Sequence, residues 1–433
     1  MSGRVNWVRR ILVRAVVLSI GDELILGQTV DTNAAWLSKQ IAGMGIFVQE
    51  HITVGDDPKA IADQLRRAAA ISDVIVATGG LGPTDDDLTR YALADVLEAD
   101  LCLDESILRQ IEEFFVRRDR TMPARNRIQA MFPAGSEVIP NPLGTAPGML
   151  AAIGSINEGG KASAFFLPGV PREMKGMYAH FVEDRLKKLL EGEGKSEVLV
   201  TRIVHTVGAG ESKIAEWLGT MMSRGMNPVV NSTAAHMIVS LRINARAADE
   251  KAARELIQPV ERDIVNRLGD YVFGYDNDTL AGVVGRLLRD RGETLATSES
   301  CTGGWLSKEI TDVPGSSDYF RNGWVVYSNE AKISQLGVDR KVLEAEGAVS
   351  GSVAKQLAAN AREISGADYG IGITGIAGPG GGTKAKPVGL AYLAVADAVE
   401  VHVSKYIFPG NRDMVRSRAV NIALNMLRLQ LLK

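Results

Sequence analysis

Three residues that can act as nucleophiles stand side by side in this sequence, at Ser300, Cys301 and Thr302. A short apolar run over 294–297 precedes them and an amphipathic stretch follows, which predicts a strand, a polar junction and a helix. Backbone N–H groups at the start of a helix favour developing negative charge, so they could hold an oxyanion beside a nucleophile. The alternative is that the junction only caps the helix, because Ser and Thr are ordinary capping residues.

A lysine is the base that fits this junction best. A cysteine nucleophile usually needs a histidine partner, and His402 is the only histidine after residue 280. His402 alternates with valines on a predicted strand, where it is more simply interpreted as a residue of one strand face. Lys332 follows Tyr327, the end of a predicted strand, by just over one helical turn, which places it near that strand end. Taken alone, Lys332 would be interpreted as a solvated helix lysine.

A glycine-rich loop and an arginine complete this candidate site. The run from Gly372 to Gly382 follows a predicted strand, and its glycines let backbone amides approach an anion closely. The run lacks the Gly-Lys-Ser/Thr ending of a P-loop, and a flexible hairpin loop is the alternative. Arg412 opens the last predicted helix, where it suits a phosphate contact or is an exposed residue of the helix start.

A second candidate site lies in the first third of the chain. Residues 79–87 read Gly-Gly-Leu-Gly-Pro-Thr-Asp-Asp-Asp, after a predicted strand and before a helix. Glycines at a helix start suit phosphate, and clustered carboxylates suit a divalent cation that could activate water. Asp22, Glu23 and Asp56 fall at comparable strand ends. The alternative is that the three aspartates of 79–87 only cap the helix.

The elements that must position these residues alternate along the chain. A β-α-β-α-β order over 16–78 predicts a parallel, doubly wound sheet, which binds ligands at the carboxyl ends of its strands. Residues 198–268 fit a compact α+β module, and alternation resumes after residue 280. We therefore predict an α/β protein with two α/β domains, whose sheets are doubly wound or mixed, joined by the small α+β module. The predicted domains are 1–190, 195–272 and 278–433.

Composition excludes several classes of protein. The chain has 433 residues and a formal net charge of −3, which argues against a dominant electrostatic footprint for nucleic acid. Cys102 and Cys301 are the only cysteines, so no disulfide framework or CxxC metal pair is present, and a reducing cytoplasm is expected. No window approaches the roughly 20 apolar residues of a membrane-spanning helix.

The last third of the chain resembles the nicotinamide-mononucleotide amidohydrolases, which form the C-terminal domain of CinA proteins. The resemblance covers about 280–433. It implies that Ser300 is the nucleophile, Lys332 the base, Tyr327 an assisting hydroxyl and Arg412 a site residue, and it implies no cofactor. It is carried by Glu299–Gly304, Gly315–Ser317, Tyr327–Lys332, Gly347–Ser350, Gly375–Pro379, Lys386–Gly389 and Phe408–Arg412.

The first 190 residues look like the molybdopterin-binding, MoaB/MogA-like fold that opens CinA proteins. This likeness implies nucleotide or pterin binding, and some relatives look like ADP-ribose pyrophosphatases. The motifs are Gly21–Leu24, Gly27, Thr32–Asn33, Gly79–Asp87, Gly144–Gly148 and Pro168–Met174. The middle module is similar in layout to a KH domain, which binds nucleic acid through a GxxG loop. No GxxG loop lies between residues 194 and 274, so nucleic-acid binding is not expected. A spacer or dimerisation unit is the simpler interpretation.

Patterns and resemblance together predict two sets of site residues and two ligands, nicotinamide mononucleotide and ADP-ribose. The C-terminal site has catalytic Ser300, Lys332 and Tyr327, with substrate contacts from Cys301, Thr302, Gly303, Thr374, Gly375, Gly378 and Arg412. The N-terminal site has nucleotide contacts from Gly79, Gly80, Gly82, Thr84, Asp87 and Asn33, and a divalent metal held by Asp22, Glu23, Asp56, Asp85 and Asp87.

Two classes of function remain open from sequence. One is a two-site enzyme, expected to be a homodimer. The other is a competence- or DNA-damage-related scaffold whose N-terminal site only binds a nucleotide or pterin. The pairing of a serine with a lysine favours the enzyme, because a scaffold needs neither.

Overall fold

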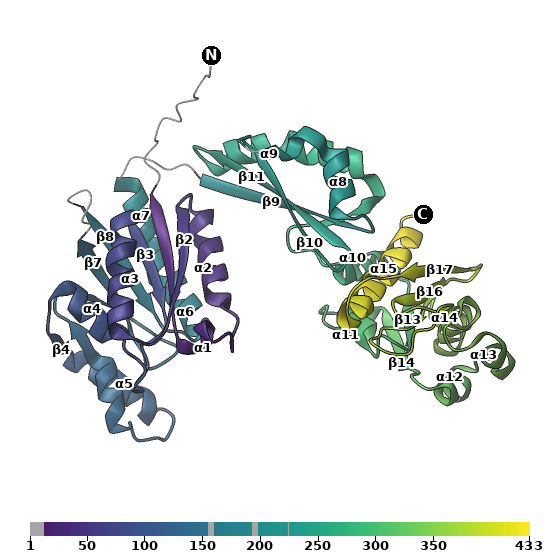
Figure 1. Cartoon of the computed structure of the whole chain (residues 1–433), viewed down its shortest axis with the longest axis horizontal. Helices are drawn as coiled ribbons and strands as arrows, with labels where there is room; N and C mark the ends of the chain where they lie inside the picture. The colour runs from purple at the N-terminus through teal and green to yellow at the C-terminus, as the bar shows by residue number, and fades with distance from the viewer. Residues whose placement is uncertain (1–12, 155–159, 193–197, 224) are drawn as a thin grey trace, which may run out of the picture. The chain divides into compact units, whose positions relative to one another are not determined.

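The computed structural model describes residues 13–154, 160–192, 198–223 and 225–433 (Figure 1). The predicted boundary at 191–195 lies largely outside these residues. The chain divides into two compact units, one of residues 1–200 with 246–253 and the other of 201–245 with 254–433. No helix among the described residues is long and apolar enough to cross a membrane.

The first unit is built on a six-stranded sheet of order β2-β1-β3-β8-β7-β6. Strands β2, β1, β3 and β8 are parallel, and β7 pairs antiparallel with both β8 and the edge strand β6, so the sheet is mixed. A separate two-stranded ribbon pairs β4 with β5. The strands are β1 Arg14–Ile20, β2 Phe47–Val54, β3 Val74–Thr78, β4 Leu101–Leu103, β5 Met131–Pro133, β6 Glu137–Ile139, β7 Gly148–Gly154 and β8 Lys161–Leu167. The helices are α1 Asp22–Ile25, α2 Thr32–Gly43, α3 Pro58–Ile71, α4 Thr89–Leu97, α5 Glu105–Val116, α6 Pro171–Met177 and α7 Glu183–Gly192.

Both faces of this sheet are covered, as a doubly wound arrangement requires. Every residue of β3 is buried, the pattern of a strand packed on both sides. The helices α3, α4 and α5 cover one face with one apolar cluster, and α2, α6 and α7 cover the other. Helix α3 begins at Pro58, and the carboxylate of Asp57 accepts from the Ala60 amide, so local sequence sets its start.

The middle module in the second unit is a four-stranded sheet of order β10-β11-β9-β12 with two helices. Its bounds are β9 Val198–Val207, α8 Glu211–Leu218, β10 Val229–Ala235, β11 Ile238–Ala247, α9 Glu250–Leu268 and β12 Val272–Tyr275. Its β-α-β-β-α-β order fits the predicted α+β module. Helix α8 ends at Leu218, because Gly219 leaves the α conformation and a 3₁₀ turn follows.

The C-terminal part of the second unit holds a five-stranded sheet of order β14-β13-β15-β16-β17. Strands β14, β13 and β15 are parallel, and β16 pairs antiparallel with both β15 and β17. The strands are β13 Leu295–Glu299, β14 Phe320–Val325, β15 Tyr369–Gly375, β16 Leu390–Ala396 and β17 Val401–Ile407. The helices are α10 Leu280–Arg291, α11 Trp305–Thr311, α12 Asn329–Leu336, α13 Arg340–Glu346, α14 Gly351–Ser365 and α15 Arg412–Leu431.

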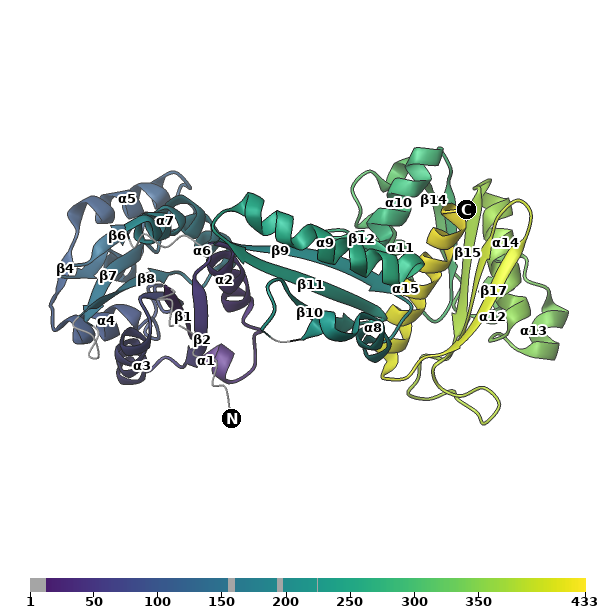
Figure 2. The ribbon, with the colours of Figure 1, turned by 90° about the horizontal axis from the view of Figure 1, so that it is seen from above.

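Figure 2 shows α15 on one side of strands β15 to β17 and α14 on the other. On β15, Ile371 and Ile373 join the apolar cluster that contains α15, while the alternate residues face α14. A Cβ on Gly372 would meet the carbonyl oxygen of Ala354 at 2.5 Å, so glycine lets α14 pack directly on the sheet. The α/β prediction, including a mixed sheet, is confirmed. As parallel strands, β13, β14 and β15 bring their carboxyl ends to one edge, where the candidate residues lie.

Candidate active site

The hydroxyl of Ser300 and the amine of Lys332 lie within hydrogen-bond distance. The Lys332 Nζ is 3.1 Å from the Ser300 Oγ. Ser300 directly follows β13, and its amide donates to the carbonyl of Ile373 on neighbouring β15 at 3.0 Å. Lys332 lies in the first turn of α12, which begins where Ser328 accepts a hydrogen bond from the Ala331 amide. The tertiary structure therefore brings together the two residues that sequence singled out.

The amine of Lys332 is buried among acceptors that carry no charge. The side chain is 1% exposed, which excludes the solvated-lysine alternative. Besides Ser300, its Nζ lies 2.8 Å from the carbonyl oxygen of Val326 and 3.2 Å from that of Tyr327. Burial lowers the pKa of Lys332 below its ordinary 10.5, although the charges of Cys301 and Glu330 act in the opposite direction. Since carbonyls only accept, the amine must donate to them, and a neutral amine then has its lone pair left for the serine proton.

Tyr327 and Arg412 meet at the edge of this pair. The guanidinium of Arg412 donates to the phenol oxygen of Tyr327 at 3.1 Å and to the carbonyl of Gly378 at 2.9 Å. The ring of Tyr327 is 61% exposed and follows β14, which ends at Val325 rather than at the predicted Tyr327. Arg412 therefore links the glycine loop to Tyr327. A guanidinium has five N–H donors, so Arg412 keeps donors for a ligand as well.

The predicted strand, polar junction and helix are present, but the amides at the helix start are not free to hold an oxyanion. Helix α11 begins at Trp305, after a turn in which Gly303 and Gly304 have φ values of 58° and 91°. The carboxylate of Glu299 accepts from the amides of Gly304, Leu306 and Ser307, so these helix-start amides are already occupied. The physical reason is that the buried carboxylate is itself the anion at the helix N-terminus.

The other two candidate nucleophiles are placed less favourably. Cys301 is buried, and burial raises the pKa of its thiol to about 11, so little thiolate forms near neutral pH. Thr302 is fully buried, and its Oγ1 has no partner among the described residues. The amide of Gly303 donates to the carbonyl of Ser300 at 3.1 Å, whereas no described residue accepts from the amides of Cys301 and Thr302 in this turn.

Thr374 and the glycines of the loop have mainly supporting contacts. The hydroxyl of Thr374 is buried and donates to the carbonyl of Ala348 at 2.8 Å. A Cβ on Gly375 would meet the carbonyl of Leu390 at 2.7 Å, where the antiparallel strand β16 passes. Lys386 lies in a motif that carries the resemblance, but sequence reasoning gave it no role; its Nζ donates to the carbonyl of Val349 at 2.7 Å and so fixes the segment before α14. Sequence reasoning also gave no role to Glu299, which stands next to the nucleophile in its motif, or to Arg416.

The glycine loop of the first unit is shaped by Asp87. Its carboxylate accepts from the amide of Gly82 at 2.6 Å and from the amide and hydroxyl of Thr84 at 2.8 and 2.5 Å. The residues Gly79, Gly80, Gly82 and Asp87 line one cavity of about 400 Å³, but Thr84 and Asp85 do not. Asp87 therefore holds the loop, and its oxygens are engaged in doing so.

Two residues without a predicted role, Thr89 and Arg90, donate hydrogen bonds to the carbonyls of this loop. Arg90 is fully buried, and its guanidinium donates to the carbonyls of Leu81 and Gly82; burial lowers its pKa to about 10. The hydroxyl of Thr89 donates to the carbonyl of Gly79 at 2.9 Å. Thr89 and Arg90 thus bind carbonyl oxygens of the loop. No described residue accepts from the amides of Gly80 and Leu81, so these two amides are free to bind an anion in the cavity.

The predicted metal ligands are only partly gathered. Asp22 and Asp56 each accept from the other's backbone amide, at 3.0 and 2.9 Å. Burial raises the pKa of Asp56, and the nearby charges of Asp22, Glu23 and Asp86 add to the rise. Among the described residues, no three His, Cys, Asp or Glu side chains are grouped so that they could hold a metal ion. Glu23, Asp56, Asp86 and Asp87 line the cavity, so a bound cation would need oxygen atoms from a ligand as well.

Asn33 lies behind the cavity rather than on its wall. Its amide nitrogen donates to the carbonyl of Gly169 at 2.8 Å and to the hydroxyl of Thr78 at 3.3 Å. It therefore ties the loop after β8 to the end of β3. The polar and charged side chains of the lining that sequence reasoning did not assign are Asp86, Gln129, Thr145 and Glu173.

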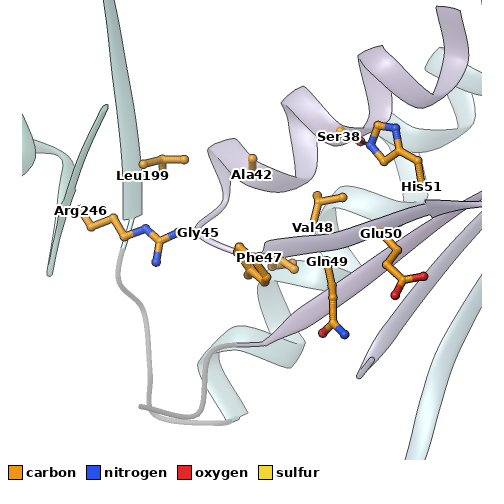
Figure 3. A pocket seen from close by; sticks show the side chains of 11 residues that line it. Ser38, Ala42, Gly45, Phe47, Val48, Gln49, Glu50, His51, Leu199 and Arg246 are labelled. Atoms are coloured by element: carbon orange, nitrogen blue, oxygen red, sulfur yellow. Dashed lines mark hydrogen bonds between the residues drawn. The ribbon is translucent and has the colours of Figure 1, made fainter. Parts of the chain in front are cut away.

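Another pocket of the first unit, of about 330 Å³, runs along the edge strand β2 and contains none of the predicted site residues (Figure 3). His51 points from β2 towards α2, where its Nε2 lies 2.5 Å from the hydroxyl of Ser38. Both side chains already have each other as partners, and the pocket lacks a glycine loop, so it offers no comparable anion site.

Comparison with known proteins covers most of the chain. The family model for the probable molybdopterin binding domain matches residues 16–188, that for the damage-inducible protein CinA KH domain matches 201–274, and that for the CinA C-terminal domain matches 277–431. The chain is 43% identical to a Clostridium kluyveri protein over 97% of this chain and 100% of that one. It is also 43% identical to a Symbiobacterium thermophilum protein over 96% and 99%. Both relatives are named among the competence-damage inducible proteins.

Among solved structures, a CinA protein of unknown function from Thermoplasma acidophilum is 33% identical, covering 40% of this chain and 98% of its own, with a TM-score of 0.36. The whole-length sequence matches, together with the three domain matches in order, confirm the predicted resemblance. The chain belongs to the CinA family, with a MoaB-like domain, a KH domain and a CinA C-terminal domain.

Proposed function

We propose that the C-terminal domain hydrolyses the carboxamide of nicotinamide mononucleotide to nicotinate mononucleotide and ammonia. The observation that carries this proposal is the buried Lys332 amine 3.1 Å from the Ser300 hydroxyl. A serine hydroxyl is a weak nucleophile unless a base lies beside it, and a lysine can act as that base when its pKa is lowered. The choice of substrate rests on the family resemblance and on Arg412, which suits a phosphate.

In the first half-reaction the Ser300 Oγ attacks the carboxamide carbon while its proton passes to the Lys332 Nζ. A C–O bond forms, and the carbonyl oxygen becomes an oxyanion. As the tetrahedral intermediate collapses, the C–N bond breaks and Lys332 returns the proton to the leaving nitrogen, which departs as ammonia. Ser300 is left as an ester of the pyridine acid.

Water completes the cycle in the second half-reaction. Lys332 takes a proton from the water as its oxygen attacks the ester carbon, and it then protonates the Ser300 Oγ as the ester bond breaks. The products are the free carboxylic acid and the original enzyme. Serine and lysine supply the nucleophile and the base, so the proposed mechanism requires no metal ion.

Ammonia release from nicotinamide mononucleotide by the purified full chain tests this proposal. We expect turnover that a chelator does not affect, and a loss of orders of magnitude in kcat in both Ser300→Ala and Lys332→Met. Because the pair acts as a unit, the double variant should lose little more than either single variant. Lys308→Met is the matched control, since Lys308 is an exposed lysine on α11. Undiminished turnover in Ser300→Ala would contradict the mechanism.

For the first unit we propose a second activity, binding and cleavage of a dinucleotide pyrophosphate such as ADP-ribose. The supporting observation is the 400 Å³ cavity, whose lining includes Gly80 and Leu81, with their free amides, and the carboxylate residues Glu23 and Asp56. Mg²⁺ is commonly held by one or two carboxylates together with substrate phosphates, so metal binding here should depend on the nucleotide. Calorimetry with ADP-ribose, with and without Mg²⁺, followed by assay for AMP tests it. Binding with no AMP under any divalent ion would reduce the domain to a binding module.

A further inference from the structure

Glu299 is the residue directly before the proposed nucleophile, and its side chain is completely buried. Its Oε2 accepts from the amides of Gly304 and Leu306, both at 3.0 Å. Its Oε1 accepts from the amide and the hydroxyl of Ser307, both at 2.8 Å. Among the described residues, no lysine or arginine forms an ion pair with this carboxylate. Backbone amides and one hydroxyl are therefore what compensates its burial.

These contacts close the chain into a tight turn around the nucleophile. The turn leaves β13 at Glu299 and returns to the same carboxylate at Gly304 and at the start of α11. Gly303 and Gly304 have φ values of 58° and 91°, which glycine adopts without the cost that side chains impose. The turn is thus fixed from within by one carboxylate.

A second contact fixes the turn from outside. Arg416, one helical turn after Arg412 on α15, donates to the carbonyl of Thr302 at 2.7 Å. Its guanidinium also lies over the ring of Trp305, 5.1 Å from the ring centroid. With the Thr302 carbonyl held on the α15 side, the peptide plane between Thr302 and Gly303 cannot rotate freely.

Most backbone amides of this turn already have an acceptor. The amide of Ser300 donates to Ile373, that of Gly303 donates to Ser300, and those from Gly304 onwards donate to Glu299 or within the turn. In the described part of the chain, no other residue accepts from the amides of Cys301 and Thr302. Two adjacent free amides directly after a nucleophile are the arrangement that an oxyanion hole needs.

We infer that Glu299 is a positioning residue of the amidase site: it binds the helix-start amides and so holds the Cys301 and Thr302 amides as the oxyanion hole for Ser300. This inference rests on the proposed amide hydrolysis. Glu299 touches neither substrate nor the reacting atoms, and its effect passes through the turn. Glu299 occupies the amides at the start of α11, which could otherwise bind the oxyanion. The amides of Cys301 and Thr302, which precede them in the turn, bind it instead.

The test is Glu299→Gln in the full chain, with Glu309→Gln as the matched control. The amide nitrogen of glutamine cannot accept, so one pair of hydrogen bonds is lost with little change in volume. We expect kcat to fall about 10²-fold, as for loss of an oxyanion donor, while KM stays within about twofold. The midpoint of the pH–rate profile should not move, because the base is unchanged. Glu309 lies on α11 and accepts from the Trp305 indole, and its variant should keep wild-type kcat.

A milder variant covers the case in which Glu299→Gln does not fold. Ser307→Ala removes one donor to the same carboxylate and should lower kcat about fivefold. A folded Glu299→Gln or Ser307→Ala protein with wild-type kcat would overturn the inference, as would a loss seen only in KM.

A second readout separates this inference from the choice of substrate. An alkyl phosphonofluoridate phosphonylates an activated serine: the Ser300 oxygen bonds to phosphorus, fluoride leaves, and the serine proton passes to Lys332. Mass spectrometry follows the rate. If the wild type is labelled at Ser300 but releases no ammonia from nicotinamide mononucleotide, the proposed function fails alone. Glu299→Gln should still be labelled about 10²-fold more slowly; equal labelling rates would overturn the positioning role.

Discussion

The guanidinium of Arg412 bridges the phenol oxygen of Tyr327, 3.1 Å away, and the carbonyl of Gly378, 2.9 Å away. One side chain at the start of α15 thus joins the segment after β14 to the glycine loop. Both partners are loop residues, and neither position is fixed by regular secondary structure. The edge of the proposed amidase site therefore depends on a single arginine.

Removal of Arg412 should weaken substrate binding more than it slows the chemical steps. In Arg412→Ala we expect KM for nicotinamide mononucleotide to rise about tenfold or more, because both a phosphate contact and the loop anchor are lost. Tyr327→Phe keeps the ring and should have a smaller effect. Steady-state kinetics measure both, with Arg340→Ala on α13 as an exposed control. An unchanged KM in Arg412→Ala would show that the arginine is only structural.

The amidase reaction should depend on pH through Lys332. Burial lowers the pKa of this lysine from its ordinary 10.5, and only the neutral amine accepts the serine proton. The active form is therefore present above the lowered pKa and is lost as pH falls through it, so kcat should reach its plateau below pH 10.5. Glu330→Gln removes a charge that raises this pKa, and should move the midpoint to lower pH. A midpoint at 10.5 or above in the wild type would contradict the lowered pKa.

The two cysteines should differ strongly in reactivity. Cys102 is exposed, whereas Cys301 is buried with a pKa raised to about 11. Iodoacetamide near pH 7.5 should therefore alkylate Cys102 first, as peptide mass spectrometry can show. Cys301→Ser should keep amidase activity within about tenfold of wild type, since only its backbone amide has a proposed role. Rapid alkylation of Cys301 with parallel loss of activity would transfer the nucleophile to that thiol.

In the first unit, Asp87 should act through the shape of the glycine loop. Its carboxylate holds the amides of Gly82 and Thr84, so Asp87→Ala should release the loop and weaken ADP-ribose binding at least tenfold. Thermal unfolding of the variant should stay cooperative, because Asp87 itself is not part of the apolar clusters of the sheet. Asp85→Ala, outside the cavity lining, is the control and should bind as the wild type does. Equal affinities in both variants would remove Asp87 from the site.

Much of this architecture can be predicted from local pattern. Apolar runs, capping residues and glycine punctuation predict the strands β1 to β3 and β13 to β17 and the long helices between them, because these signals act over a few residues. The sequence pattern does not predict the strands β4, β5 and β6, since each is only three residues long and shows no clear periodicity. The nucleophile motif and the lysine can also be found in sequence, because their residue types limit the chemistry.

The tertiary structure alone decided what those residues contact. Ser300 and Lys332 are 32 residues apart, and Thr302 and Arg416 are 114 apart, so no local periodicity relates them. The burial of Lys332, which removes the solvated alternative, follows from α12 packing on the strand ends. Whether Glu299 or a ligand takes the first amides of α11 depends on where a buried carboxylate points, and the packing of β13 beneath the turn sets that direction.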